Sequence, residues 1–109
     1  MHDFRRLEVW ERAHSLTLSV YRVTRSFPPE ERFGLGKQMR RAAVSIESNI
    51  AEGSGRSSNA DFSRFLSMAN GSAAELLAQS LVAADLRLVS EETGQAWETE
   101  LGDVQRMLE

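Results

Sequence analysis

The sequence predicts an all-α protein that folds as an antiparallel up-down-up-down four-helix bundle. Three observations support this prediction. Four segments carry apolar residues at alternating spacings of three and four, both prolines fall in one connection, and Ala, Leu, Glu, Arg and Ser dominate the composition. Short connections between such helices favour antiparallel packing. The 109 residues, of which 41% are hydrophobic, can bury one core, so we expect a single domain over residues 1–109.

The first predicted helix runs from about Leu7 to Ser26. Its apolar stripe has the spacing of one buried helix face and comprises Trp10, Ala13, Leu16, Val20, Val23 and Phe27. Asp3 is the expected capping residue, and the two consecutive prolines end the helix because proline cannot donate within it. A single turn is predicted over residues 29–31, followed by Phe33 pointing inward.

The second predicted helix begins at Gly36 as its N-cap and runs to about Ser54. Its core-facing stripe is Leu35, Met39, Ala42, Ile46, Ile50 and Gly53. Beside this runs a polar stripe at spacings of three and four, made of Gln38, Arg41, Ser45, Asn49, Glu52 and Arg56. Ala43, Val44 and Ala51 widen the apolar surface on the other flank. Such a wide apolar arc with small residues can be approached closely by a second neighbour.

The third predicted helix is long, about residues 60–88, and Ser58 or Asn59 can cap it. Its stripe comprises Phe62, Phe65, Leu66, Ala69, Ala73, Leu76, Ser80, Ala83 and Ala84, and an adjoining ridge comprises Leu77, Leu81 and Leu88. The stripe continues across Gly71-Ser72, so this pair is predicted to form a close helix–helix contact without breaking the helix. Ser90 is the predicted cap of the fourth helix, whose stripe is Trp97, Leu101, Val104 and Leu108.

The apolar surface of the second and third helices exceeds what one bundle needs, and exposed patches of this kind mark interfaces. We therefore expect a homo-oligomer. The candidate interface or polar-network residues are Ala43, Val44, Asn49, Ala51, Glu52, Leu77 and Leu81. Asn49 is expected to bond either Ser45 or a loop backbone, and Glu52 to pair with Arg56 one turn later. The favoured interpretation is a polar network that fixes the register of the bundle or of the subunit contact, and the alternative is a binding groove.

Motifs for catalysis are weak in this sequence. There is no cysteine, which excludes disulfides and thiolate metal sites. A di-metal bundle site needs two Glu-x-x-His motifs, but only Glu11-x-x-His14 is present. Gly53-Ser54-Gly55 lacks the ending of a phosphate loop and follows a predicted helix, so it is interpreted as a helix terminator. We expect no enzyme activity, no metal and no cofactor; a metal or small-molecule enzyme remains an alternative that rests on Glu11 and His14 alone.

Charge is distributed unevenly along the chain. The net charge is −3, but residues 1–64 hold 11 Arg and Lys against 8 Asp and Glu, whereas residues 65–109 hold 2 against 8. A polyanionic partner therefore has to use the first half, where Lys37, Arg40 and Arg41 cluster. The sequence has neither an apolar run of about 20 residues nor a signal peptide, so we expect a cytoplasmic protein without a membrane partner.

Five stretches of the sequence resemble a known family. They are Phe4-x-x-Leu7-x-Val9-Trp10-x-x-Ala13, Tyr21-x-x-Thr24-x-x-Phe27-Pro28, Phe33-Gly34-Leu35-x-x-Gln38-x-Arg40-Arg41-Ala42, Ser45-Ile46-x-x-Asn49-Ile50-Ala51-Glu52-Gly53-x-Gly55-Arg56 and Phe62-x-x-Phe65-Leu66-x-x-Ala69-x-Gly71-Ser72-x-x-Glu75-Leu76. In this order they are similar to the bacterial four-helix bundle proteins, also called the 23S rRNA intervening-sequence protein family. The resemblance covers nearly the whole chain.

The resemblance implies a homopentamer around a central channel. A related accessory protein of diversity-generating retroelements engages nucleic acid through a basic pentamer surface, which implies a nucleic-acid contact at Lys37, Arg40, Arg41 and Arg56 of this chain. The leading hypothesis is a non-enzymatic oligomeric scaffold or adaptor that contacts RNA or an RNA-bound protein. The alternative is a protein–protein interaction module that binds no nucleic acid.

Overall fold

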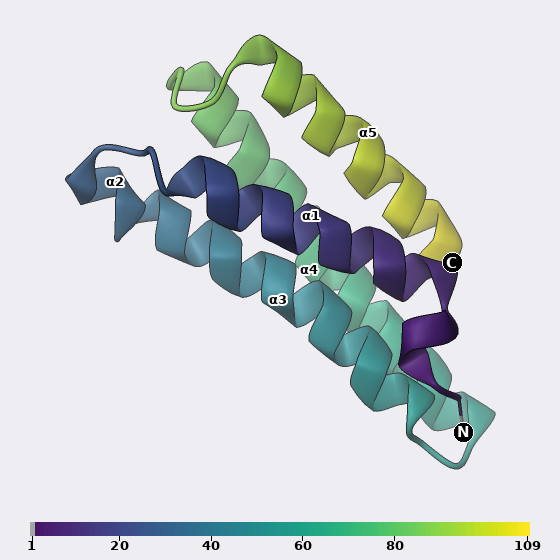
Figure 1. Cartoon of the computed structure of the whole chain (residues 1–109). Coiled ribbons are helices and arrows are strands. Elements are labelled where there is room, and N and C mark those ends of the chain that lie inside the picture. Colours follow the sequence, from purple (N-terminus) through teal and green to yellow (C-terminus); the bar gives the residue numbers. More distant parts are fainter. Residues whose placement is uncertain (1) are drawn as a thin grey trace.

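The computed structural model describes residues 2–109, in which helices are joined by short connections and no strand is present (Figure 1). The chain order is a 3₁₀ turn η1 (Phe4–Arg6), α1 (Glu8–Thr24), a short α2 (Pro29–Arg32), α3 (Leu35–Ser54), α4 (Asn59–Asp85) and α5 (Glu91–Leu108). The four long helices coincide with the four predicted ones. The all-α prediction is therefore confirmed.

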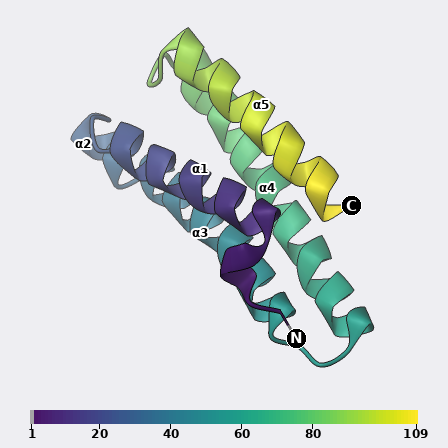
Figure 2. The same ribbon diagram turned by 45° about the vertical axis from the view of Figure 1, so that its right-hand side comes forward.

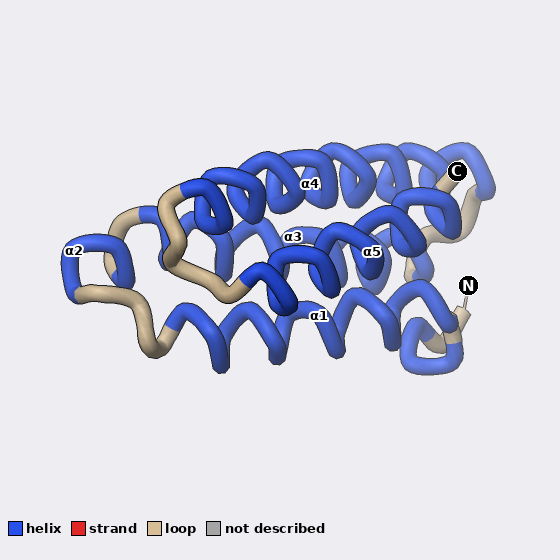
Figure 3. Tube along the Cα trace, turned by 90° about the horizontal axis from the view of Figure 1, so that it is seen from above, coloured by secondary structure: helices blue, strands red, loops and turns tan. Residues whose placement is uncertain are grey.

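The long helices form an elongated bundle with dimensions of 43 × 23 × 20 Å. α3 packs against α1 and α4, and α5 packs against the same two helices, so α1 and α4 occupy opposite corners (Figure 3). α2 and the α4–α5 connection lie at one end of the bundle. The chain termini and the α3–α4 connection lie at the other end (Figure 2).

The core contains the apolar stripes that the sequence predicts. Its largest fully buried apolar side chains are Phe27, Met39, Ile46, Ile50, Leu76, Leu101, Val20 and Val104. All four long helices contribute to this set. Burying one such side chain contributes about 1.5–3 kcal/mol to folding, so these residues fix the relative positions of the helices.

Two predicted helix caps are present. The Ser58 hydroxyl accepts a hydrogen bond from the Asp61 amide and opens α4, and the Ser90 hydroxyl accepts one from the Thr93 amide and opens α5. α4 runs through Gly71 without a break, as predicted. It ends at Asp85, three residues before the predicted end, because Arg87 takes a left-handed conformation with φ of 59° and terminates the helix.

Three local predictions near the first connections are wrong. Asp3 caps η1 through the Arg5 amide, and Leu7 precedes α1. α3 begins at Leu35 after Gly34, so Gly36 lies inside the helix, packed against Phe27 and the Glu31 carbonyl. Phe33 is 69% exposed.

The physical reasons for these differences are local. At the start of the 3₁₀ turn Phe4–Arg6, the Asp3 carboxylate accepts a hydrogen bond from the Arg5 amide. It therefore caps this turn and not α1. Buried Phe27 lies within 3.3 Å of a Cβ built on Gly36 and occupies the inward position at this end of the core. The ring of Phe33 is left outside, within 5.9 Å of the Arg32 guanidinium.

Candidate functional site

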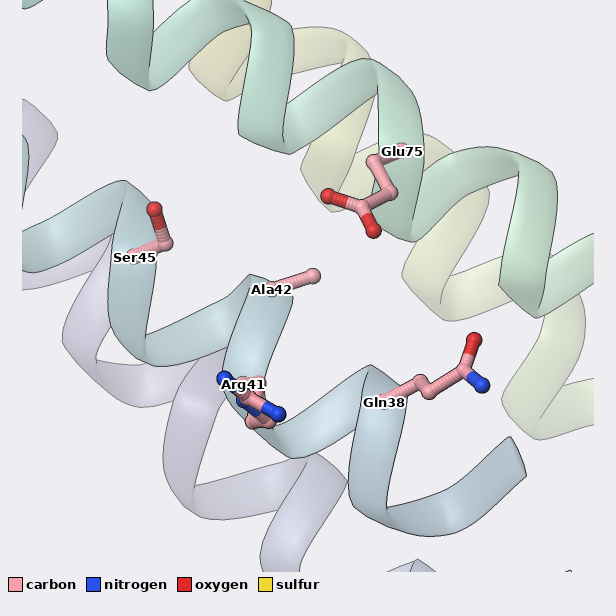
Figure 4. A pocket seen from close by; sticks show the side chains of 5 residues that line it. All are labelled: Gln38, Arg41, Ala42, Ser45 and Glu75. Atoms are coloured by element: carbon pink, nitrogen blue, oxygen red, sulfur yellow. The ribbon is translucent and has the colours of Figure 1, made fainter. Parts of the chain in front are cut away.

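The polar stripe of α3 lies along a groove between α3 and α4. At one place the groove widens into a pocket of about 550 Å³, lined by Gln38, Arg41, Ala42, Ser45 and Glu75. Figure 4 shows Glu75 projecting from α4 across the groove from Gln38 and Ser45 of α3. The lining combines an amide, a cation, a hydroxyl and a carboxylate, which suits polar contacts with a ligand or partner.

Deeper along the same groove, a small polar network joins the two helices. The hydroxyl oxygens of Ser45 and Ser72 lie 2.8 Å apart, and the Asn49 amide donates to the Ser45 carbonyl at 2.9 Å and to its hydroxyl at 3.2 Å. The predicted bond between Asn49 and Ser45 is confirmed. Because Ser72 belongs to α4, this network ties the register of α3 to that of α4.

The predicted ion pair at the end of α3 is also present. Arg56 Nη2 lies 3.8 Å from Glu52 Oε1, and the Arg56 guanidinium lies 4.6 Å from the centre of the Phe65 ring. The two side chains of the ion pair are largely exposed, so their attraction is weak in water. The contact with Phe65 therefore helps to hold Arg56 against α4.

The four basic residues predicted to bind nucleic acid do not form one patch. Arg40 turns toward α1 and α2, where its guanidinium donates to Thr24 Oγ1 and to the Arg32 carbonyl, each at 3.0 Å. Arg41 lines the α3–α4 groove. Arg56 lies just beyond the other end of α3, in the connection to α4, roughly 20 Å or more from Arg41 at the rise of an α-helix. Only Lys37 and Arg41 are exposed neighbours at the start of α3.

The predicted apolar interface residues divide into three groups. Ala43 is fully buried in the core of the single chain, so it has no surface left for a second copy. Ala51 and Leu77 are half-buried. Val44 and Leu81 are exposed on different helices, at 38% and 48%. The structure thus keeps Val44 and Leu81 as surface candidates and assigns Ala43 to the core.

The exposed apolar surface of α4 is larger than predicted, because Leu81 alone among its residues is one of the predicted interface residues. The outer face of α4, defined here as Ser67, Met68, Gly71, Ala74, Ala78, Leu81 and Val82, is exposed throughout. Among the exposed residues from 67 to 82, only Glu75 is charged. A Cβ built on Gly71 meets nothing within 4 Å, so the predicted close contact of Gly71 is absent inside the described chain. Counting charges around a helical wheel of residues 67–82 would have found this face.

The Glu11-x-x-His14 motif does not assemble a metal centre. His14 Nδ1 lies 3.0 Å from Glu47 Oε2, and its ring stacks on Trp10 with centroids 4.7 Å apart. Across residues 2–109, no three His, Cys, Asp or Glu side chains are grouped to hold a metal ion.

Two groups with shifted pKa values lie outside the groove. Hydrogen bonds from the Arg5 side chain and amide lower the pKa of exposed Asp3. Hydrogen bonds to Glu100, at 3.2 Å, and to Asp103, at 2.7 Å, raise the pKa of Arg12. The Asp3 contacts cap η1, the Arg12 contacts tie α1 to α5, and neither set involves the groove or the outer face of α4. Their role is therefore in the fold.

These features define a small helical-bundle protein with a polar groove and an uncharged helix face. The chain belongs to the family described as 23S rRNA-intervening sequence protein, whose model matches residues 5–109. The family prediction made from the sequence blocks is confirmed. A comparison with curated proteins finds no match.

The fold is similar to that of a solved structure, a protein of unknown function from the S23 ribosomal protein family of Bacteroides thetaiotaomicron. The TM-score is 0.84 and the identity is 21%, over 92% of this chain and 90% of that one. At this level of identity the likeness shows a shared fold. No helix within residues 2–109 combines the length and the apolar character needed to cross a membrane.

Proposed function

We propose that this protein is a non-enzymatic scaffold in which several copies assemble through the outer face of α4. The observation that supports this proposal is the composition of that face, where small and apolar residues are exposed over four helical turns beside a single charge, Glu75. A helix that is apolar nearly all round is normally buried. Gly71, Ala74 and Ala78 have short or absent side chains, which lets a second helix approach closely.

The occupant we propose for this face is another copy of the chain, in a homopentamer of antiparallel up-down-up-down bundles. A ring needs two different surfaces on each subunit, because each copy contacts one neighbour on each side. A second exposed apolar surface is available on α1 and α3, where Leu18, Tyr21 and Val44 are 45%, 43% and 38% exposed. Since α1 and α4 occupy opposite corners of the bundle, these surfaces can serve two different neighbours.

The proposal is tested by placing a charge on the outer face of α4. In Ala78→Glu, a carboxylate is buried against the neighbouring copy without a partner, and we expect the assembly to dissociate. The matched control is Ala96→Glu, which makes the same exchange at an exposed position of α5. Analytical ultracentrifugation should find the wild type and the control as multiples of 12.2 kDa and Ala78→Glu near 12.2 kDa. An unchanged mass for a folded Ala78→Glu would contradict the proposed interface.

RNA is the second candidate partner of this scaffold, as the family's name suggests. Lys37 and Arg41 favour it, because both are exposed at the start of α3 and neither is in an ion pair within residues 2–109. In a ring, these residues recur once per subunit, which concentrates positive charge in a chain whose net charge is −3.

Binding of a single-stranded RNA is the direct test of the proposed RNA contact. We expect affinity to fall steeply with salt and to be lost in the double variant Lys37→Glu, Arg41→Glu, which spares the hydrogen bonds of Arg40. Arg87→Glu, on an exposed residue of the α4–α5 connection, is the control. If wild-type protein binds no RNA at low salt while remaining assembled, the alternative of a purely protein-binding module is favoured.

A further inference from the structure

We propose that a pocket lined by Tyr21, Arg25, Arg32 and Arg40 binds a phosphate group. The pocket has a volume of about 160 Å³ and lies where α1, α2 and α3 meet. It is separate from the α3–α4 groove and from the outer face of α4. We call it the arginine pocket.

Three arginines line this pocket, and none of them has a carboxylate partner among residues 2–109. None of the ion pairs among residues 2–109 includes Arg25, Arg32 or Arg40. The neighbouring acids on α2, Glu30 and Glu31, are likewise absent from these pairs. Three positive charges around one pocket repel one another, and a bound dianion relieves that repulsion. Phosphate is the oxyanion whose geometry matches the forked donors of arginine.

Part of the arginine pocket is preorganised in the absence of a ligand. Arg40 is held by hydrogen bonds to Thr24 Oγ1 and to the Arg32 carbonyl, each at 3.0 Å, and its guanidinium lies 5.8 Å from the centre of the Tyr21 ring. Thr24 is itself buried and donates to the Val20 carbonyl at 2.7 Å. Arg40 is therefore oriented in advance, which lowers the entropy lost on binding.

Unused hydrogen-bond donors point to an acceptor as the missing partner. Arg40 uses two of its five N–H groups in the bonds to Thr24 and Arg32. Arg32 Nε is buried and has no hydrogen-bond partner among residues 2–109. Buried donors are normally paired, and an unpaired one calls for an acceptor. Phosphate oxygens supply several acceptors at once, together with the negative charge that the three arginines favour.

Two exposed aromatic rings lie beside the arginines. Tyr21 lines the pocket and is 43% exposed, and Phe33, next to Arg32, is 69% exposed. Exposed rings next to cations are the combination on which nucleotide bases stack. The phosphate group can therefore arrive free or at the end of an RNA strand, and the experiment below separates these two sources.

The test is calorimetric titration of the full-length protein with inorganic phosphate in a chloride buffer. We expect saturable binding at one site per chain. Arg25→Gln removes one exposed arginine of the pocket and should weaken binding about tenfold, the typical effect of losing a charge-assisted hydrogen bond. The control is Arg22→Gln, which removes the same charge from an exposed position of α1 outside the pocket and should change affinity by less than about twofold.

A second titration uses a short RNA with a 5′-phosphate and the same RNA with a 5′-hydroxyl. Preference for the phosphorylated end that is lost in Arg25→Gln identifies an RNA end as the source, and binding of inorganic phosphate alone identifies the free anion. Absence of saturable binding in both titrations overturns the proposal. Equal weakening of binding by Arg22→Gln and Arg25→Gln also overturns the proposal, because the effect then comes from the overall charge of the protein and not from a contact in the pocket. Tyr21 also belongs to the second apolar surface proposed for assembly, but phosphate binding is measured by titration and assembly by molar mass, so failure of one proposal is distinguishable from failure of the other.

Discussion

Gly53 of α3 packs directly against Phe65 of α4. A Cβ built on Gly53 lies 2.7 Å from the Cβ of Phe65 and 3.1 Å from Cδ1 of Phe62. The Cβ of Phe65 is fixed by the α4 backbone, so it cannot move aside by a rotamer change. A side chain at position 53 therefore pushes the helices apart, and only glycine allows this approach.

We expect Gly53→Ala to lower the free energy of unfolding by about 1–3 kcal/mol, because overpacking outweighs the better helix propensity of alanine. Urea denaturation measures this difference. The matched control is Gly102→Ala inside α5, where the nearest atom to an added Cβ is Arg106 Nη1, at an ordinary van der Waals distance of 3.6 Å. There the free energy of unfolding should stay constant or rise by up to about 1 kcal/mol. Equal effects at both positions would contradict the packing described here.

The hydrogen bond between α5 and α1 is a second test of the fold. Trp97 is 2% exposed, and its indole Nε1–H donates to Ser19 Oγ at 2.9 Å. Ser19→Ala leaves this buried donor unpaired and should destabilise the protein by about 1–3 kcal/mol. In a Trp97→Phe background the same substitution should have almost no effect, since the donor is gone. A double-mutant cycle measured by thermal unfolding gives the coupling, and a coupling near zero would contradict the bond's role.

Arg12 connects α1 to the acidic α5 through Glu100 and Asp103. Arg12→Gln should lower the free energy of unfolding by about 1 kcal/mol, because Glu100 and Asp103 both lose their ion pair with α1, although Asp103 keeps its pair with Arg106. High salt should reduce this difference. The raised pKa of Arg12 stabilises the fold below its ordinary titration range, and this contribution is lost only as pH rises through the folded pKa. The difference between wild type and variant should therefore be constant between about pH 6 and pH 9.

Helix positions and the core could be predicted from the sequence because both depend on local periodicity. Met39, Ile46 and Ile50 recur at helical spacing and are fully buried. The pair Asn49 and Ser45 was predictable for the same reason, since residues four apart on a helix are neighbours.

The arginine pocket could not be predicted, because it depends on where α2 places its residues. Arg40 and Arg41 are adjacent in the sequence and indicate one basic cluster. In the structure they diverge by about 100° around α3, so Arg40 meets Thr24 while Arg41 lines the groove beside Glu75. Arg25 and Arg32 join Arg40 only through the fold. The exposure of Phe33 was missed because Phe27 takes the buried position at this end.

The most direct test of the proposed scaffold is the molar mass of the wild-type protein in solution, measured by sedimentation equilibrium over a range of concentrations. The outer face of α4 predicts an assembled species whose mass is a multiple of 12.2 kDa, five times that value for the pentamer. A mass of 12.2 kDa at every concentration would show that the protein is a monomer whose α4 outer face is exposed to solvent, and it would contradict the proposed assembly.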